Sequence, residues 1–580
     1  MSSIAPMQTV AQFLLFLAIV VACVKPAGAY MARVFSGERT FMDSALRPLE
    51  RLIYRLARID SSREMTWSEY AVAFTLFSLA GTLVLYALLR AQSWLPFADP
   101  ANLTTPMTPD LAANTAISFS TTTTWQAYAG ETTMSYLAQI LGLAGQNFLA
   151  GAAGLAVGIA FIRGFTRERS ATLGNFWVDL TRATLWVLLP LSLVGGVLLI
   201  WQGVPLNFAP YTKTVTLEGT TQVIAQGPVA ALELIKNLGT NGGGYFNVNG
   251  AHPFENPTPL TNFLEMLAIA VLPAALTHTF GRMAGNTRQG WMLLWVMVAL
   301  FAVGLGTTTW AEKRGDPLVA NASGMAVSSS TEQSGGNMEG KEVRFGIGAS
   351  VLTAVTTSNG ATGSYNAMHD SFTPIGGAVP LVNMLLGELL FGGLGTGFYS
   401  ILEVALLGIF IVGLMVGRTP DYLGKRIGTT EIKLIVLYAL IGPATVLTLS
   451  AIALSSHAGL AGLTTNSGIH GFTEIVFAYA SAFANNGQNF AGLSANSPFY
   501  NISTAAAMVS GRFVLAILAL ALAGRMGAAQ RRSVVGSMPT DSITFGLVLV
   551  GTMIVVGALT YLPLLALGPL AEHFTMLTGR

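Results

Sequence analysis

Four short polar segments of this sequence carry residue types that suit the binding of a dehydrated cation. One contains Thr123-Thr124 and three contain an Asn-Gly pair, at Asn241-Gly242, Asn359-Gly360 and Asn486-Gly487. An aromatic residue follows the second member of each pair after twelve positions. Backbone carbonyls with Thr or Asn oxygens can replace the hydration shell of an ion, and glycine permits the backbone angles that turn carbonyls inward. The similar intervals predict a fourfold repeat around an ion filter.

A competing interpretation is that each Asn-Gly pair marks an ordinary tight turn, and Asn249-Gly250 lacks the aromatic residue. Four copies at matching positions of the repeat favour the filter over ordinary turns. No Thr-Val-Gly-Tyr-Gly motif occurs, which indicates one ion site or a short filter. The predicted filter residues are Thr122, Thr123, Thr124, Thr240, Asn241, Gly242, Gly243, Ser358, Asn359, Gly360, Asn485, Asn486 and Gly487.

A short apolar stretch precedes each polar segment, at residues 111–119, 228–238, 348–355 and 472–483. None is long enough to cross a bilayer, so each is expected to form a re-entrant half-helix followed by an extended loop. The C-terminal end of a helix carries partial negative charge. Four such ends aimed at one axis would favour a cation there.

The elements that must position these segments are membrane spans. The 580 residues are 52% hydrophobic and only 10% charged, with a mean hydropathy of +0.58, which excludes a soluble protein of this size. The sequence predicts an all-α integral membrane protein with ten transmembrane helices near residues 8–28, 69–90, 136–162, 175–202, 258–281, 289–310, 376–417, 432–455, 502–524 and 541–568.

The basic residues follow the predicted topology. With the N-terminus outside, Lys and Arg gather in the inner loops, whereas residues 456–499 on the outer side contain none. The positive-inside rule therefore predicts that both termini lie outside. The repeat divides the chain into an extra N-terminal helix and inner loop (1–60), four repeats (61–165, 166–285, 286–425 and 426–530) and an extra C-terminal helix (531–580).

The seventh apolar run is about twice the length of one span and is interrupted by Gly392, Gly393, Gly395 and Gly397. Two full spans here would place the later basic loops outside, so one broken helix fits better. Non-helical backbone at membrane depth is tolerated where it lines a cavity. Glu388 lies just before the break, and a carboxylate at that depth is a functional candidate.

Several motifs of energy coupling and metal binding are absent from the sequence. It has no Gly-x4-Gly-Lys-Ser/Thr phosphate loop and no Asp-Lys-Thr-Gly phosphorylation motif, so another chain must hydrolyse ATP if ions move uphill. The single cysteine, Cys23, excludes an intrachain disulfide, and the six histidines show no ligand spacing.

Two stretches, residues 237–247 and 251–263, closely resemble the potassium-binding A subunits of the bacterial Kdp potassium-transporting ATPases. The resemblance covers essentially the whole chain and is supported at residues 114–119, 366–372, 417–424 and 485–490. One departure is the run from Thr121 to Thr124, where relatives tend to alternate Thr and Asn.

The resemblance implies a relative of the Trk, Ktr and HKT potassium transporters, with K+ as the transported ion and no organic cofactor. It implies a channel-like, high-affinity potassium uptake subunit that is not an enzyme by itself. The expected partners are a P-type ATPase B subunit, a C subunit and a small F peptide in the bacterial inner membrane, together with membrane lipids, and no nucleic acid is expected. Potassium would pass through an intramembrane tunnel to the B subunit, and an autonomous Trk- or Ktr-like channel or symporter is the alternative. By position, Glu388, Gly392, Gly393 and Gly395 match the gating loop of the family, and Arg418 and Arg512 match its inner arginines.

Overall fold

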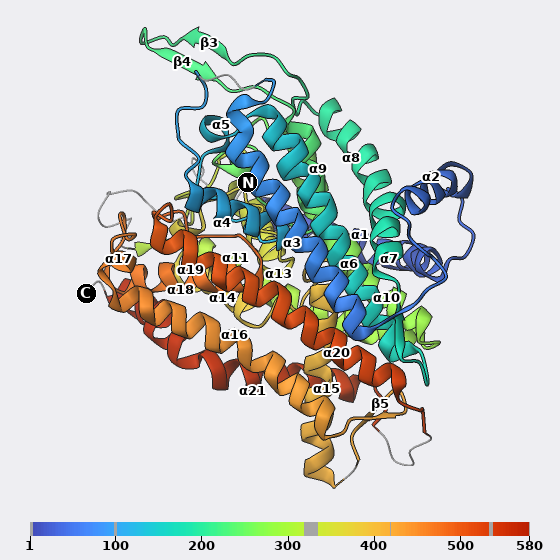
Figure 1. Cartoon of the computed structure of the whole chain (residues 1–580). Coiled ribbons are helices and arrows are strands. Elements are labelled where there is room, and N and C mark those ends of the chain that lie inside the picture. Colours follow the sequence, from blue (N-terminus) through green and yellow to red (C-terminus); the bar gives the residue numbers. More distant parts are fainter. Residues whose placement is uncertain (1–3, 98–100, 318–334, 418, 533–537, 579–580) are drawn as a thin grey trace.

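The structure, a computed structural model, describes residues 4–97, 101–317, 335–417, 419–532 and 538–578. Within these ranges ten helices are long and apolar enough to cross a membrane, which confirms the predicted all-α membrane protein with ten spans (Figure 1). The spans are built from α1 (Ile4–Ser36), α3 (Trp67–Ala91), α6 (Gly145–Thr166), α7 (Phe176–Arg182) with α8 (Leu189–Trp201), α10 (Pro259–Met283), α11 (Thr287–Arg314), α15 (Thr396–Val416), α16 (Thr429–Ser455), α19 (Pro498–Val509) with α20 (Leu515–Ala528), and α21 (Ile543–Leu565).

Four of these spans include a π-helical turn. The turns cover Ala138–Ala144, Ala183–Leu188, Ser510–Val514 and Ala566–Leu570. Four of the smaller helices are α2 (Asp43–Leu56), α5 (Gly130–Thr133), α17 (His457–Leu460) and α22 (Ala571–Thr578). The π-helical turns widen their helices locally, and such turns are frequent at functional sites.

Four shorter helices lie between consecutive spans: α4 (Pro109–Ser120), α9 (Val229–Leu238), α13 (Gly346–Asn359) and α18 (Gly468–Ala484). At a rise of about 1.5 Å per residue none reaches the roughly 30 Å of a hydrocarbon core. They pack against the preceding spans, α4 on α3, α9 on α8, α13 on α11 and α18 on α16. The order span, short helix, span therefore occurs four times. The exact repeat boundaries stay a prediction.

A hydroxyl residue followed by proline starts the helix after three of the four polar segments. Thr258, Thr373 and Ser497 each accept a hydrogen bond from a backbone N–H of the first turn, and proline follows each of them. The side-chain oxygen satisfies a free N–H, and proline is preorganised for the first helical position. These caps fix where each polar loop ends.

The seventh apolar run is interrupted, as predicted for a broken helix, and consists of two helical segments. The first, α14 (Pro374–Leu385), has 12 residues, and α15 begins only at Thr396. We call residues 386–395 the break. Because α14 is too short to cross a bilayer, the run does not form two full spans.

Short strands lie at opposite ends of the helices (Figure 1). The hairpin of β3 (Thr212–Val215) and β4 (Thr221–Ile224) projects from one end, which we call the hairpin face. The pair β5 (Asp421–Tyr422) with β6 (Lys425–Arg426) lies at the other end. The pair β1 (Met65–Thr66) with β2 (Thr172–Gly174) contacts α20 near the same end. We call that end the basic face.

The loops of the basic face hold one another in place. The Lys425 ammonium donates to the backbone oxygens of Gly164, at 3.0 Å, and Met526, at 2.7 Å, at the ends of α6 and α20. The N–H of Arg532 donates to the carbonyl of Gly424 at 2.8 Å. Basic loops that are far apart in the sequence are therefore joined on one face, as a common side of the membrane requires.

A buried ion pair joins α6 to α7 near this face. Both guanidinium Nη atoms of Arg163 contact the carboxylate of Asp179, at 2.5 and 2.8 Å, and the Tyr70 hydroxyl donates to the same carboxylate at 3.0 Å. We expect Asp179→Ala to lower the free energy of unfolding by about 3–5 kcal/mol, because it leaves a buried guanidinium unpaired. Thermal unfolding in detergent measures the change.

The matched control is Glu64→Gln, which breaks the exposed pair between Glu64 and Arg167 at 2.8 Å. Exposed pairs contribute only about 0–1 kcal/mol. Equal losses of stability in the two variants would contradict a structural role for the buried pair.

Candidate functional site

The loops that follow the four short helices share one backbone pattern. In each, two residues separated by one position adopt positive φ: Thr122 and Thr124 (64° and 49°), Thr240 and Gly242 (50° and 80°), Ala361 and Gly363 (49° and 72°), Asn485 and Gly487 (56° and 81°). The residues between them, Thr123, Asn241, Thr362 and Asn486, therefore occupy equivalent positions. We call residues 121–124, 239–243, 360–363 and 485–488 the ring loops.

Contacts between the ring loops close a circle. A Cβ atom added to Gly242 would lie 1.4 Å from the carbonyl oxygen of Thr362, and one on Gly363 would lie 2.1 Å from that of Asn486. A Cβ on Gly487 would lie 2.0 Å from the carbonyl oxygen of Thr123. The Thr124 hydroxyl donates to the carbonyl of Asn241 and completes the circle. Glycine is needed at three of the four contacts because the neighbouring backbone leaves no room for a side chain.

Three of the four predicted segments lie in this ring, and the third is displaced. Ser358 and Asn359 are the last two residues of α13, and Gly360 caps that helix with its N–H bonded to the Thr356 carbonyl. Thr362 and Gly363 take the ring position instead. The Asn359 amide is used within α13, donating to the Val355 carbonyl at 2.9 Å.

A sequence signal for the third loop existed but was missed. The same number of residues separates Gly363 from Thr373-Pro374 and Gly487 from Ser497-Pro498. Aligning the loops on the helix caps that follow, instead of on the Asn-Gly pairs, identifies Thr362 and Gly363.

Buried polar side chains support the ring from behind. The Asn485 amide donates to the Thr123 hydroxyl at 2.9 Å, and the Asn486 amide donates to the Glu388 carboxylate at 2.7 Å. In the second loop, the backbone N–H groups of Asn241 and Gly242 both donate to the carbonyl of Lys236 at 2.8 Å. Each of these bonds fixes a residue of the ring or its neighbour.

Lys236 is itself held by a buried network that the sequence did not reveal. Its ammonium lies 2.7 Å from a Glu233 oxygen and 2.9 Å from both Glu255 and Asn249, and the Lys236 and glutamate side chains are fully buried. Burial raises the pKa of Glu233. Burial alone would lower the pKa of Lys236, but the nearby Glu233, Glu255 and Glu265 outweigh it and raise that pKa above its usual value. A buried charge network of this kind rigidifies the second ring loop.

A cavity of about 730 Å³ lies against one side of the ring, and we call it the vestibule. All four ring loops line it, through Thr124, Gly243, Gly363 and Gly487. Behind Gly487, the amide of Gln488 contacts His369 Nδ1 at 2.6 Å. Burial and the nearby Lys341 charge lower the pKa of His369 to about 3, so this imidazole is neutral near pH 7 and adds no positive charge beside the ring.

The break closes the opposite side of the ring. A cavity of only about 10 Å³ lies between Gly393 and Leu394 of the break and the ring residues Thr122, Thr240, Ala361 and Asn485. The Leu394 N–H donates to the Thr240 hydroxyl at 2.7 Å. A space of this size holds one water molecule and no hydrated ion.

The glycines of the break allow its close approach to neighbouring backbone. A Cβ on Gly392 would lie 1.6 Å from the Glu388 carbonyl oxygen, and one on Gly395, whose φ is +97°, would lie 2.1 Å from that of Gly154 in α6. Glu388 and Phe391 also adopt positive φ, of 54° and 51°. Strained backbone of this kind persists only where the surroundings enforce it.

A buried arginine lies beneath the ring. Arg512, in the π-helical turn of the ninth span, lines the same small cavity, and its guanidinium donates to the Ala150 carbonyl at 2.9 Å. A positive charge at this place is of the sign that repels a cation. Arg418, the other predicted arginine, lies outside the described residues.

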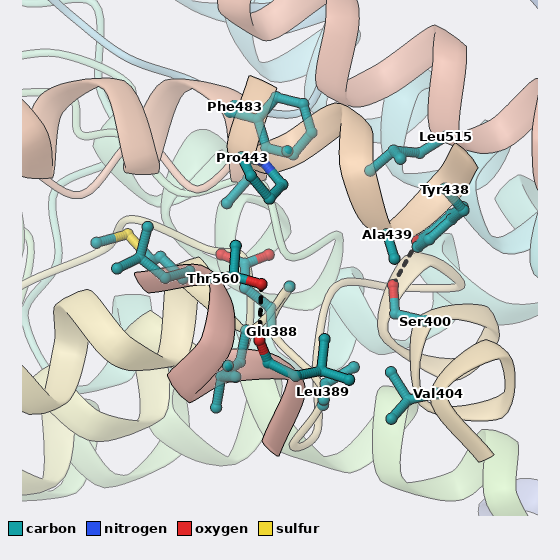
Figure 2. A pocket seen from close by; sticks show the side chains of 18 of the residues that line it. Glu388, Leu389, Ser400, Val404, Tyr438, Ala439, Pro443, Phe483, Leu515 and Thr560 are labelled. Carbon is teal, nitrogen blue, oxygen red and sulfur yellow. Dashed lines mark hydrogen bonds between the residues drawn. The ribbon is translucent and has the colours of Figure 1, made fainter. Parts of the chain in front are cut away.

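A third cavity, of about 110 Å³, extends sideways from the break, and we call it the side cavity. Its walls come from α14, the break, α15, α16, α18, α20 and α21, and Figure 2 shows Glu388 at one part of it and the Ser400–Tyr438 hydrogen bond at another. Asn485 of the fourth ring loop also lines it. The side cavity therefore reaches the fourth ring loop at Asn485, next to Gly511 of the π-helical turn that also carries Arg512.

Comparison with known proteins identifies similar chains over almost the full length. The family described as "Potassium-transporting ATPase A subunit" matches residues 14–574. The protein named potassium-transporting ATPase potassium-binding subunit in Methylorubrum extorquens is 53% identical over 570 residues, which cover 98% of each chain. Those with the same name in Methylobacterium nodulans and Koribacter versatilis are 52% and 49% identical, again over 98% of each chain.

Proposed function

This chain belongs to the family of potassium-transporting ATPase A subunits, and we propose that it selects K+ at the ring and delivers it sideways to a partner chain. It is a component subunit, not the chain that hydrolyses ATP. The single observation that carries the route is the geometry around the ring, which is open to the vestibule, closed by the break and joined to the side cavity.

The ring offers the ligands that K+ requires. The carbonyls of Thr123, Asn241, Thr362 and Asn486 occupy equivalent positions, and four helix C-termini end next to them. We assign the ion site to these carbonyls, with hydroxyl or amide oxygens from Thr122, Thr124, Thr240 and Asn485 near the same axis. A ring of weak oxygen dipoles replaces the hydration of K+, and the helix ends add negative potential.

The break and Arg512 act as the gate in this proposal. A cation in the ring meets Leu394 and a buried guanidinium on the vertical path, whereas Glu388 and Asn485 border the side cavity. The ion therefore leaves sideways, toward the ATPase partner. Because the vertical exit is blocked in this proposal, release of the ion depends on the partner chain, and ion transport is thereby coupled to ATP hydrolysis.

We assign the partners and orientation as follows. The complex contains a P-type ATPase B subunit, a C subunit and a small F peptide in the bacterial inner membrane. We place the basic face on the cytoplasmic side, because the basic loops of Lys425 and Arg532 are joined there and basic loops favour the cytoplasm. The ten spans among the described residues are an even number, which puts both termini on one side, and we assign that side to the outside together with the β3–β4 hairpin.

Rubidium uptake by bacterial cells without potassium uptake systems of their own tests the proposal. The chain is expressed alone and together with its ATPase partners. We expect uptake only with the partners, because the break blocks the vertical path. Equal uptake by the chain alone would identify an autonomous channel and contradict the gate.

A further inference from the structure

The side cavity contains a carboxylate that the proposed gate does not use. Glu403 lies in the middle of α15, on the face that also carries Thr396, Ser400 and Leu407, and all four residues line the cavity. Their spacing places them along one side of the helix. Only 2% of the Glu403 surface is exposed.

Glu403 lacks the partners that a buried carboxylate needs. Neither of its oxygens has a hydrogen-bond partner among the described residues. Glu388, the other acid of the cavity, accepts a hydrogen bond from the Asn486 amide at 2.7 Å. Buried charges in proteins are paired or bind a cation, and acids inside membrane proteins mark ion pathways. Glu403 is thus the acid available to a transported ion.

Neutral oxygen ligands lie on the same wall. The hydroxyls of Ser400 and Tyr438 are 2.6 Å apart and hydrogen-bond across α15 and α16 (Figure 2). The cavity volume of about 110 Å³ accommodates an ion with several water molecules. A lipid tail would satisfy the apolar walls but leave the carboxylate without a partner. A monovalent cation arriving from the ring satisfies both the charge and the hydroxyls.

We propose that Glu403, with the hydroxyls of Ser400 and Tyr438, forms a second cation site in the side cavity, where an ion rests after leaving the ring. This inference builds on the proposed function, since it places one station on the sideways route. The site takes K+ or a monovalent ion of similar size. Its single carboxylate holds the ion weakly enough to release it.

Thallium(I), an anomalous scatterer close in size to K+, tests the site directly in crystals of the complete ATPase complex. We expect anomalous density at the ring and beside Glu403. In Glu403→Gln the peak in the side cavity should disappear while the peak at the ring remains. Tyr438→Phe, which removes one hydroxyl and keeps the aromatic ring, should weaken only the side-cavity peak.

Turnover provides the second readout. Glu403→Gln should lower potassium-stimulated ATP hydrolysis by about tenfold, the effect of losing one charged contact. The K+ concentration that gives half-maximal ATP hydrolysis should change less, because the ring is intact. Glu339→Gln, which neutralises an exposed acid outside the cavity, is the matched control and should behave like the wild type.

The outcomes separate the two proposals. A thallium peak at the ring with none beside Glu403, or a side-cavity peak that survives in Glu403→Gln, would overturn the second site alone. Lipid density in place of the ion would do the same. Absence of a peak at the ring would instead overturn the proposed function.

Discussion

Replacing Gly242 with aspartate is expected to weaken the potassium stimulation of the assembled ATPase complex by about 100-fold or more. A Cβ at this position would lie 1.4 Å from the Thr362 carbonyl oxygen, and the φ of +80° disfavours any side chain. Strained backbone at one residue alone amounts to about 1–3 kcal/mol. Every 1.4 kcal/mol lost from ion binding is about tenfold in affinity. The carboxylate adds a charge that the ring is not built to hold.

The control separates the ring from general backbone strain. Gly219, in the turn of the β3–β4 hairpin, also has positive φ, of +82°, but an added Cβ meets no atom within 4 Å. Gly219→Asp should therefore leave potassium stimulation unchanged. Gly242→Ala, which adds bulk without charge, should give an intermediate loss. Normal stimulation in a correctly assembled Gly242→Asp complex would remove Gly242 from the ion path.

The arrangement of helices was predictable because it depends on the length and polarity of apolar runs. Runs such as residues 258–281 match a span such as Pro259–Met283. The short helices were predictable for the same reason. These features require no knowledge of contacts between distant residues.

The details of the ring depend on contacts between residues that are far apart in the sequence, so they were predicted less well. Asn359-Gly360 matches the Asn-Gly pattern of the other ring loops. However, α13 continues through Asn359, so Thr362 and Gly363 occupy the ring position instead. A local motif cannot show where a helix ends when its neighbours favour another turn.

Buried charges show the same limit. Lys236 belongs to a stretch that reads as an ordinary short helix, yet its side chain is fully buried against Glu233 and Glu255. Glu403 lies in an apolar span and has no motif. The roles of both residues depend on which side chains face a cavity or a charge, and only the fold determines that.

Shortening the break by removing Gly392, Gly393 and Leu394 is expected to open the vertical path. The deletion removes the Leu394 bond to Thr240 and the backbone that fills the underside of the ring. Passive rubidium flux through proteoliposomes without ATP should then rise by about tenfold, which corresponds to a barrier lower by about 1.4 kcal/mol. Flux should not rise further, because the Arg512 charge remains beneath the ring.

A milder variant and a matched deletion make this expectation decisive. Gly395→Ala forces the break away from Gly154, where a Cβ would lie 2.1 Å from the carbonyl oxygen, and should raise passive flux to a lesser degree. Removing three residues from the exposed β3–β4 turn shortens the chain equally without touching the ring and should have no effect. If both break variants assemble normally and conduct no more than the wild type, the barrier to vertical exit lies elsewhere. Adding Arg512→Gln to the deletion should increase the flux again, since in the proposed gate the break obstructs the path by its volume and the guanidinium by its charge.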